Sequence, residues 1–128
     1  MGKANVKKRK LELHSLFSYE TSTSIIRFFD ATLIDDRWSG GEKKGKFLIV
    51  VYPKQLEDLI EENESYREIK KLRNKLKLPR MHRRKVLEIA KEKFRTHRKV
   101  KRMWYPDFES AWKEFKRLTG VDDTWLLK

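Results

Sequence analysis

The stretch KFLIVVY, residues 46–52, decides the fold that this sequence predicts. Its aliphatic, β-branched and aromatic residues are typical of a buried strand. Two similar runs precede it, LELHSLFSY at residues 11–19 and SIIRFFDATLI at residues 24–34. The polar run ETSTS and the glycine-bearing loop DDRWSGGEKKGK separate the three runs. We therefore expect a three-stranded antiparallel β-meander, because consecutive strands usually pair with one another.

After residue 52 the apolar spacing becomes helical. Leu56, Leu59 and Ile60 form one short apolar stripe behind Pro53, and the capping-box sequence SYRE at residues 65–68 predicts the start of another helix. The inward positions of that helix are expected to be Tyr66, Ile69, Leu72 and Leu76, with Pro79 as its stop.

Two further helices are expected in the last third of the chain. One covers residues 83–97, with Val86, Leu87, Ala90 and Phe94 facing inward. The other lies within PDFESAWKEFKRLTG, residues 106–120, between Asp107 as N-cap and Gly120 as C-terminal stop. The sequence thus predicts a basic flexible tail at residues 1–10 and a single α+β domain at residues 11–128. In that domain the three-stranded meander is followed by three or four helices packed on one face of the sheet.

The charge of the chain is concentrated in one segment. Of the 128 residues, 32 are basic and 19 acidic, a formal net charge of +13. Residues 67–102 hold seventeen basic and three acidic residues, whereas residues 11–66 hold six and eleven. Segregated charge of this kind creates a field that attracts phosphates. We therefore expect nucleic acid as the partner.

The basic segment has the proportions of a candidate helix-turn-helix, with the link PRMH between two helical patterns. This favours duplex DNA over RNA, although an ordinary helical hairpin is the alternative. The tail is expected to add affinity as a phosphate-binding arm. The expected contacts are Lys70, Lys71, Arg73, Arg83, Arg84, Lys85, Lys91, Arg95, Arg98, Lys99, Lys101 and Arg102 in the segment, and Lys7, Lys8, Arg9 and Lys10 in the tail.

The loop between the second and third runs offers a further candidate contact. Trp38 lies there beside Lys43 and Lys44, a combination that suits an exposed base and its phosphates. Packing of the indole back onto the sheet is the alternative.

Several classes of chemistry are excluded or disfavoured. The chain has no cysteine, so disulfides and cysteine-ligated zinc are excluded, and the composition fits the cytoplasm. The three histidines have no metal-ligand spacing, and no apolar run reaches membrane-spanning length. Asp30, Asp36 and Glu42 only superficially resemble the carboxylate set of a nuclease. We expect no metal site, no cofactor, no membrane partner and no catalytic residues.

The sequence therefore predicts a non-enzymatic nucleic-acid-binding protein, with duplex DNA favoured. Three alternatives stay open at this point: an RNA-binding protein of the ribonucleoprotein type, a small metal-dependent nuclease, and an interaction or inhibitor protein that docks on an acidic protein surface. The high lysine and glutamate content with few amides also resembles proteins from hot environments.

Overall fold

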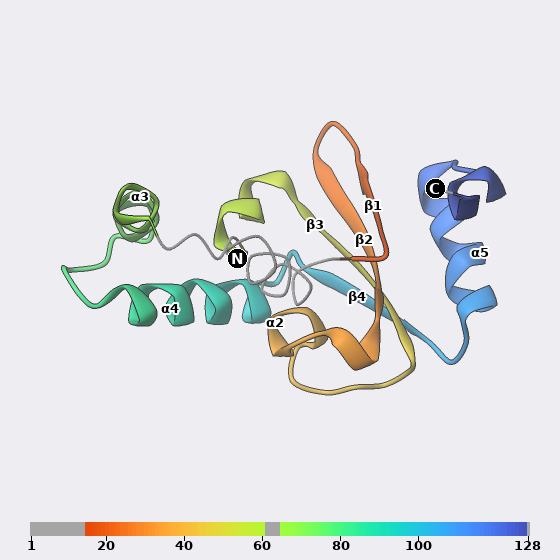
Figure 1. Cartoon of the computed structure of the whole chain (residues 1–128), viewed down its shortest axis with the longest axis horizontal. Coiled ribbons are helices and arrows are strands. Elements are labelled where there is room, and N and C mark those ends of the chain that lie inside the picture. Colours follow the sequence, from red (N-terminus) through yellow and green to blue (C-terminus); the bar gives the residue numbers. More distant parts are fainter. Residues whose placement is uncertain (1–14, 61–64, 128) are drawn as a thin grey trace, which may run out of the picture.

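The structure is a computed structural model that describes residues 15–60 and 65–127 (Figure 1). Strands and helices follow one another along the chain without a regular alternation and form an α+β fold, as the sequence predicts. In chain order the elements are β1 (Phe17–Glu20), β2 (Ser24–Asp30), η1 (Ala31–Leu33), α2 (Asp36–Ser39), β3 (Phe47–Pro53), η2 (Lys54–Leu59), α3 (Tyr66–Lys75), α4 (Arg83–Thr96), β4 (Lys101–Tyr105), α5 (Phe108–Thr119) and η3 (Asp123–Leu127).

The strands form one antiparallel sheet in the order β1-β2-β3-β4. Strands β2 and β3 pair along their whole length, with Ile26 opposite Val51, which confirms the meander of the three apolar runs. The sheet also has a fourth strand that the sequence analysis does not predict. Strand β4, KRMWY, pairs with the free edge of β3 and places Arg102 opposite Val50. It lies between the helices expected at residues 83–97 and 106–120, and it forms through pairing with β3, a contact between segments distant in sequence.

The second strand is shorter than its apolar run. Strand β2 ends at Asp30, whose carboxylate accepts a hydrogen bond from the backbone N–H of Thr32 at 2.9 Å and caps the 3₁₀ turn η1. The loop that follows contains the short helix α2, capped by Asp35 and ended by Gly40, which has a φ of 76°. The predicted long loop thus has helical structure inside it.

Helices pack on both faces of the sheet, which corrects the prediction of one covered face. Along β3, Leu48, Val50 and Tyr52 belong to one apolar cluster, and Ile49 belongs to the other. The first cluster includes residues of α2, α3 and α4, and the second is built on α5. Burial of both faces explains why the β2 and β3 sequences are almost continuously apolar instead of alternating with polar residues.

Helix α5 matches its prediction closely. Asp107 accepts a hydrogen bond from the backbone N–H of Ser110 at 2.8 Å, and Gly120 ends the helix with a φ of 81°. Its inward residues Trp112 and Phe115 are buried against Phe28 of β2. This cluster of aromatic rings attaches α5 to the sheet.

On the opposite face, Val86, Ala90 and Phe94 of α4 are all buried in the first cluster, as the helical spacing predicts. The ring of Phe94 lies against Trp38 of α2 and Tyr52 of β3, with ring centroids 5.2 and 5.0 Å away. Trp38 of α2 thus packs against both α4 and the sheet.

Helix α3 begins as predicted, because the Ser65 hydroxyl accepts a hydrogen bond from the backbone N–H of Glu68. It ends at Lys75, before Pro79, and Lys77 adopts a left-handed φ of 56°. Ile69 is buried, but Tyr66 is 74% exposed, so its prediction as an inward residue is wrong. Residues 76–82 connect α3 to α4, a link longer than the short turn of a helix-turn-helix, and the structure does not show that motif.

Candidate nucleic-acid interface

The outer face of α3 carries basic side chains and no carboxylate. Arg67, Lys70 and Lys71 are exposed, and Arg67 lies three residues before Lys70 and four before Lys71, so it neighbours both on one side of the helix. Asn74 completes this face. Arg73, also predicted as a contact, is half-buried at the edge of the core. The structure therefore gathers the predicted α3 contacts on a single surface, apart from Arg73.

The start of α4 departs from the usual charge pattern of a helix. The positive end of the helix dipole favours acidic residues in the first turn, by about 0.3–1 kcal/mol each. Glu68 and Glu109 occupy that position in α3 and α5. In α4 the first turn has no acidic residue and instead presents Arg83, Arg84 and Lys85, all exposed. Folding alone disfavours this arrangement, whereas a bound anion would be attracted by both the dipole and the cations.

These two groups lie at the same end of the molecule, far from α5 (Figure 1). The exposed Arg80 lies in the link between them. None of these basic side chains forms an ion pair with another described residue. We define the basic end as Arg67, Lys70, Lys71, Arg80, Arg83, Arg84 and Lys85.

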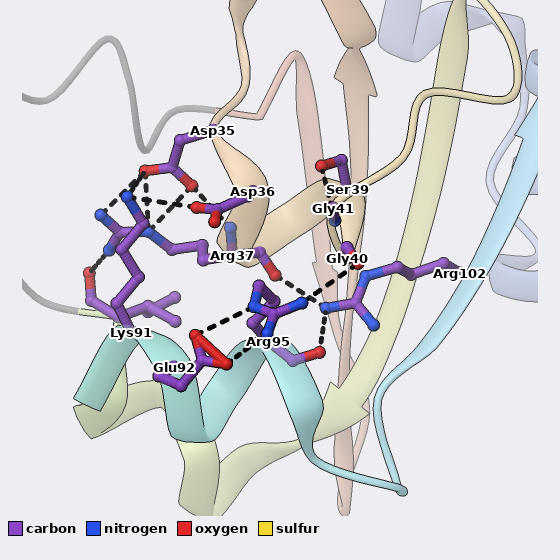
Figure 2. A network of polar contacts seen from close by, with 11 residues as sticks. Asp35, Asp36, Arg37, Ser39, Gly40, Gly41, Lys91, Glu92, Arg95 and Arg102 are labelled. Carbon is purple, nitrogen blue, oxygen red and sulfur yellow. Dashed lines mark hydrogen bonds and ion pairs between the residues drawn. The ribbon is translucent and has the colours of Figure 1, made fainter. Parts of the chain in front are cut away.

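Beyond its first turn, α4 presents a surface of mixed charge. The exposed residues Glu88 and Glu92 lie one helical turn apart on its solvent side. Arg95 is paired with Glu92, and its guanidinium also donates to the backbone carbonyl of Gly40 at 3.3 Å (Figure 2). Arg95 therefore connects α4 to α2, and its charge is offset by its own helix.

Lys91 has a similar internal role. Its ammonium lies 3.4 Å from a carboxylate oxygen of Asp35 and 3.3 Å from one of Asp36, at the start of α2 (Figure 2). Asp35 also pairs with the buried Arg37 at 3.0 Å, and Arg37 donates to the backbone carbonyl of Ile60 at 3.0 Å. These contacts fasten α2 to α4 and to the end of η2.

The side chain of Arg102 in β4 lies where helices α2 and α4 end. Its guanidinium donates to the backbone carbonyls of Arg37 at 2.7 Å and of Arg95 at 3.0 Å (Figure 2). It also donates to the backbone carbonyl of Trp38. Carbonyls at helix C-terminal ends lack partners within the helix, and a cation there is favourable. Burial and the neighbouring positive charge of Arg95 lower the pKa of Arg102. The structure therefore gives this predicted contact an internal role.

The remaining predicted contacts after α4 have no ion pair with any residue that the structure describes. Arg98, Lys99 and Lys101 are exposed in the turn that leads from α4 into β4, and none has an ion pair with a described residue. They lie at the other end of α4 from Arg83 and so form a second, smaller basic group.

Trp38 lies in the core, so its prediction as a nucleic-acid contact is not supported. Its side chain is fully buried, with the ring centroid 4.5 Å from that of Phe29 and 6.0 Å from that of Tyr52. The guanidinium of Arg27 lies 5.8 Å from the centroid of the indole ring. No face of this ring is open to a base.

The loop after α2 borders a shallow hollow of about 500 Å³. Lys43 and Lys44 are both exposed in this loop, and the ammonium of Lys44 lies 3.9 Å from a carboxylate oxygen of Glu42. The acidic neighbour offsets part of the positive charge. The hollow is lined by Ser39, Gly40, Gly41, Glu42, Lys44, Arg102 and Trp104.

A polar network on the sheet was not predicted. Arg27 donates to the Tyr52 hydroxyl at 2.8 Å and to Glu57 at 2.7 Å, and the Tyr52 hydroxyl donates to the other Glu57 oxygen at 2.5 Å. Burial, the largest cause, raises the pKa of the Tyr52 hydroxyl. The arginine in the middle of SIIRFF was the available signal, because a charge within a buried strand needs a partner.

Within residues 15–60 and 65–127, no group of three potential metal ligands converges. The carboxylates considered for a nuclease have other partners: Asp30 caps η1, Asp36 pairs with Lys91, and Glu42 lies near Lys44. Among the same residues, no helix combines the length and apolar character needed to cross a membrane. The predicted contacts Lys7, Lys8, Arg9 and Lys10 lie outside the described residues.

Comparison with known protein families, with curated proteins and with solved structures finds no match to this chain.

Proposed function

We propose that the protein binds nucleic acid through the basic end formed by α3, the link and the start of α4. The observation that carries this proposal is the first turn of α4. Three cations stand at the positive end of a helix dipole, without the acidic residues that the other two long helices carry there. Residues that lower the stability of the fold locally are expected at functional sites.

The acid-free outer face of α3 supports the same proposal. It adds Arg67, Lys70 and Lys71 at the same end of the molecule, and phosphate neutralisation by such side chains supplies most of the affinity of sequence-independent binding. The role is proposed to be binding without catalysis. The cysteine-free sequence is compatible with a reducing, cytoplasmic compartment.

On this proposal, the predicted contacts fall into residues that bind nucleic acid and residues that stabilise the fold. The basic end is proposed to meet phosphates, and Arg98, Lys99 and Lys101, at the other end of α4, and the tail at residues 7–10 are proposed to add further positive charge. Lys91, Arg95 and Arg102 stabilise the fold through their internal contacts. The preference for duplex DNA depended on a helix-turn-helix, so the proposal covers nucleic acid in either strand form.

The test compares two charge-reversed variants of equal net charge. In the first, Lys71→Glu and Arg84→Glu remove two cations from the basic end. In the control, Lys46→Glu and Lys113→Glu reverse two exposed lysines outside it. Binding to labelled DNA and RNA is measured by fluorescence anisotropy over a series of salt concentrations.

We expect the first variant to lose at least tenfold in affinity and to lower the salt slope by about two, because each lost phosphate contact removes about one. The control is expected to lose far less, through the overall field alone. Equal losses in both folded variants, or binding unchanged in the first, would contradict the proposal.

A further inference from the structure

Tyr66, the first residue of α3, stands apart from every other aromatic residue of the described chain. Its side chain is 74% exposed, whereas the other aromatic residues in the described ranges are buried or half-buried. Its ring makes no contact with another described ring, and an exposed aromatic at this position adds little to the folding of α3. A large flat ring is therefore presented to the solvent at the basic end.

The neighbours of Tyr66 on the helix surface are cations. Lys70 follows it by one helical turn, about 6 Å along the axis, and Arg67 is the next residue in the chain. Asn74 lies one further turn along and offers an amide donor and acceptor. The outer face of α3 thus combines one exposed ring, basic side chains and an amide, with no carboxylate among its exposed positions.

We propose that this face binds a single strand of nucleic acid, with an unpaired base stacked on the Tyr66 ring and the adjoining phosphates at Arg67 and Lys70. The proposal rests on the proposed function and deepens it by naming the class of ligand. Aromatic side chains and basic residues together are the usual platform for single strands, because every base has a face that can stack. In a duplex the faces of the bases are covered by their neighbours, so an exposed ring on a convex helix finds no partner there.

The experiment separates stacking from charge by using four ligands of similar length: oligo-dT, oligo-U, duplex DNA and inorganic polyphosphate, which has the phosphates without bases. Each is titrated against the full-length protein, Tyr66→Ala and Tyr66→Phe. Thermal unfolding of each variant is recorded as well, and because Tyr66 is exposed we expect no change in midpoint beyond a degree or two.

We expect Tyr66→Ala to weaken binding of both single strands by about 5- to 100-fold, the range that loss of base–aromatic stacking produces. Tyr66→Phe is expected to retain the binding, since it keeps the ring. Affinity for duplex DNA and for polyphosphate should change less than twofold in either variant. The ratio of the oligo-dT and oligo-U affinities then shows which of these two strands the face prefers.

Two results would overturn the inference. One is single-strand binding that Tyr66→Ala leaves unchanged, and the other is an equal loss for single strands and polyphosphate. Failure here is distinguishable from failure of the proposed function. If charge reversal at Lys71 and Arg84 abolishes binding and Tyr66→Ala does not weaken it, the basic end binds phosphate without stacking. If charge reversal also has no effect, both proposals fail.

Discussion

Replacement of Arg102 by methionine tests whether this basic residue belongs to the fold or to the surface. Methionine keeps much of the apolar stem that packs beside Gly40 but removes the guanidinium. Three backbone carbonyls, those of Arg37, Trp38 and Arg95, then lose a charged donor. The change affects α2, the end of α4 and β4 together.

The magnitude follows from the number of lost hydrogen bonds. A hydrogen bond to a charged group contributes about 1.5–3 kcal/mol when buried. Arg102 is half-buried, so water reaches part of the site and the contribution of each bond falls to about 1 kcal/mol. We therefore expect Arg102→Met to lower the free energy of unfolding by about 2–4 kcal/mol, a large fraction of the stability of a domain this size.

Urea unfolding followed by far-UV circular dichroism measures this loss, provided that the m-value stays constant. Arg102→Lys should recover less than half of the loss, because an ammonium cannot reach three carbonyls as a planar guanidinium does. Lys101→Met, the exposed neighbour on the same strand, is the control and should change stability by less than about 0.5 kcal/mol. An Arg102→Met protein that unfolds like wild type yet binds nucleic acid poorly would refute the internal role.

Three further predictions concern the α5 side of the sheet. Trp112→Ala should lower stability by about 3–5 kcal/mol, because this ring is buried among aromatic side chains; a melting curve like that of wild type would contradict its place in the core. Asp107→Ala should lower the free energy of unfolding through loss of the α5 N-cap, whereas Asp107→Asn, which keeps an acceptor oxygen, should lower it much less in the same chemical denaturation assay. Hydrogen bonds from Trp112 and Lys116 lower the pKa of Asp123 below its ordinary 3.8, so its contribution to stability is present above that value and is lost as the pH falls through the lowered pKa. The stability difference between wild type and Asp123→Asn should therefore shrink in acid, and a difference that stays constant down to pH 2 would contradict the assignment.

Helices α3, α4 and α5 and the first three strands were predictable because their signals are local. Helix α5 has its N-cap at Asp107, its stop at Gly120 and an apolar stripe between them, and each of these acts within a few residues. The same holds for the Ser65 cap of α3. The sequence KFLIVVY predicts a strand from its own composition.

The features that the sequence analysis missed depend on contacts between distant segments. Strand β4 contains two basic residues and is a strand because it pairs with β3. The burial of Trp38, which the sequence analysis leaves as the alternative to a nucleic-acid contact, depends on Phe94 of α4, whose ring lies against the indole. The second covered face of the sheet had a signal, the nearly unbroken apolar run of β3, which is typical of a strand buried on both sides.

The candidate site shows the same difference between features with local signals and features that depend on distant contacts. The charge distribution indicates which segment is rich in basic residues, but it does not distinguish side chains that face solvent from those with partners inside the protein. Arg84 and Arg102 look equivalent in the sequence, yet one is exposed and the other binds three carbonyls. Tyr66 was assigned to the core by helical spacing alone, although the first turn of a helix can project beyond the body that the helix packs on.

The position of β4 in the chain has a consequence for the order of folding. Strands β2 and β3 are joined by residues 31–46, whereas residues 54–100 separate β3 from β4. Closing the longer loop costs more chain entropy, and contacts between distant residues form slowly. During synthesis the apolar edge of β3 therefore stays unpaired until both α3 and α4 have left the ribosome. An open apolar edge of this kind promotes aggregation. The positive net charge of residues 67–102 makes nascent chains repel one another, and this repulsion acts until β4 covers the edge.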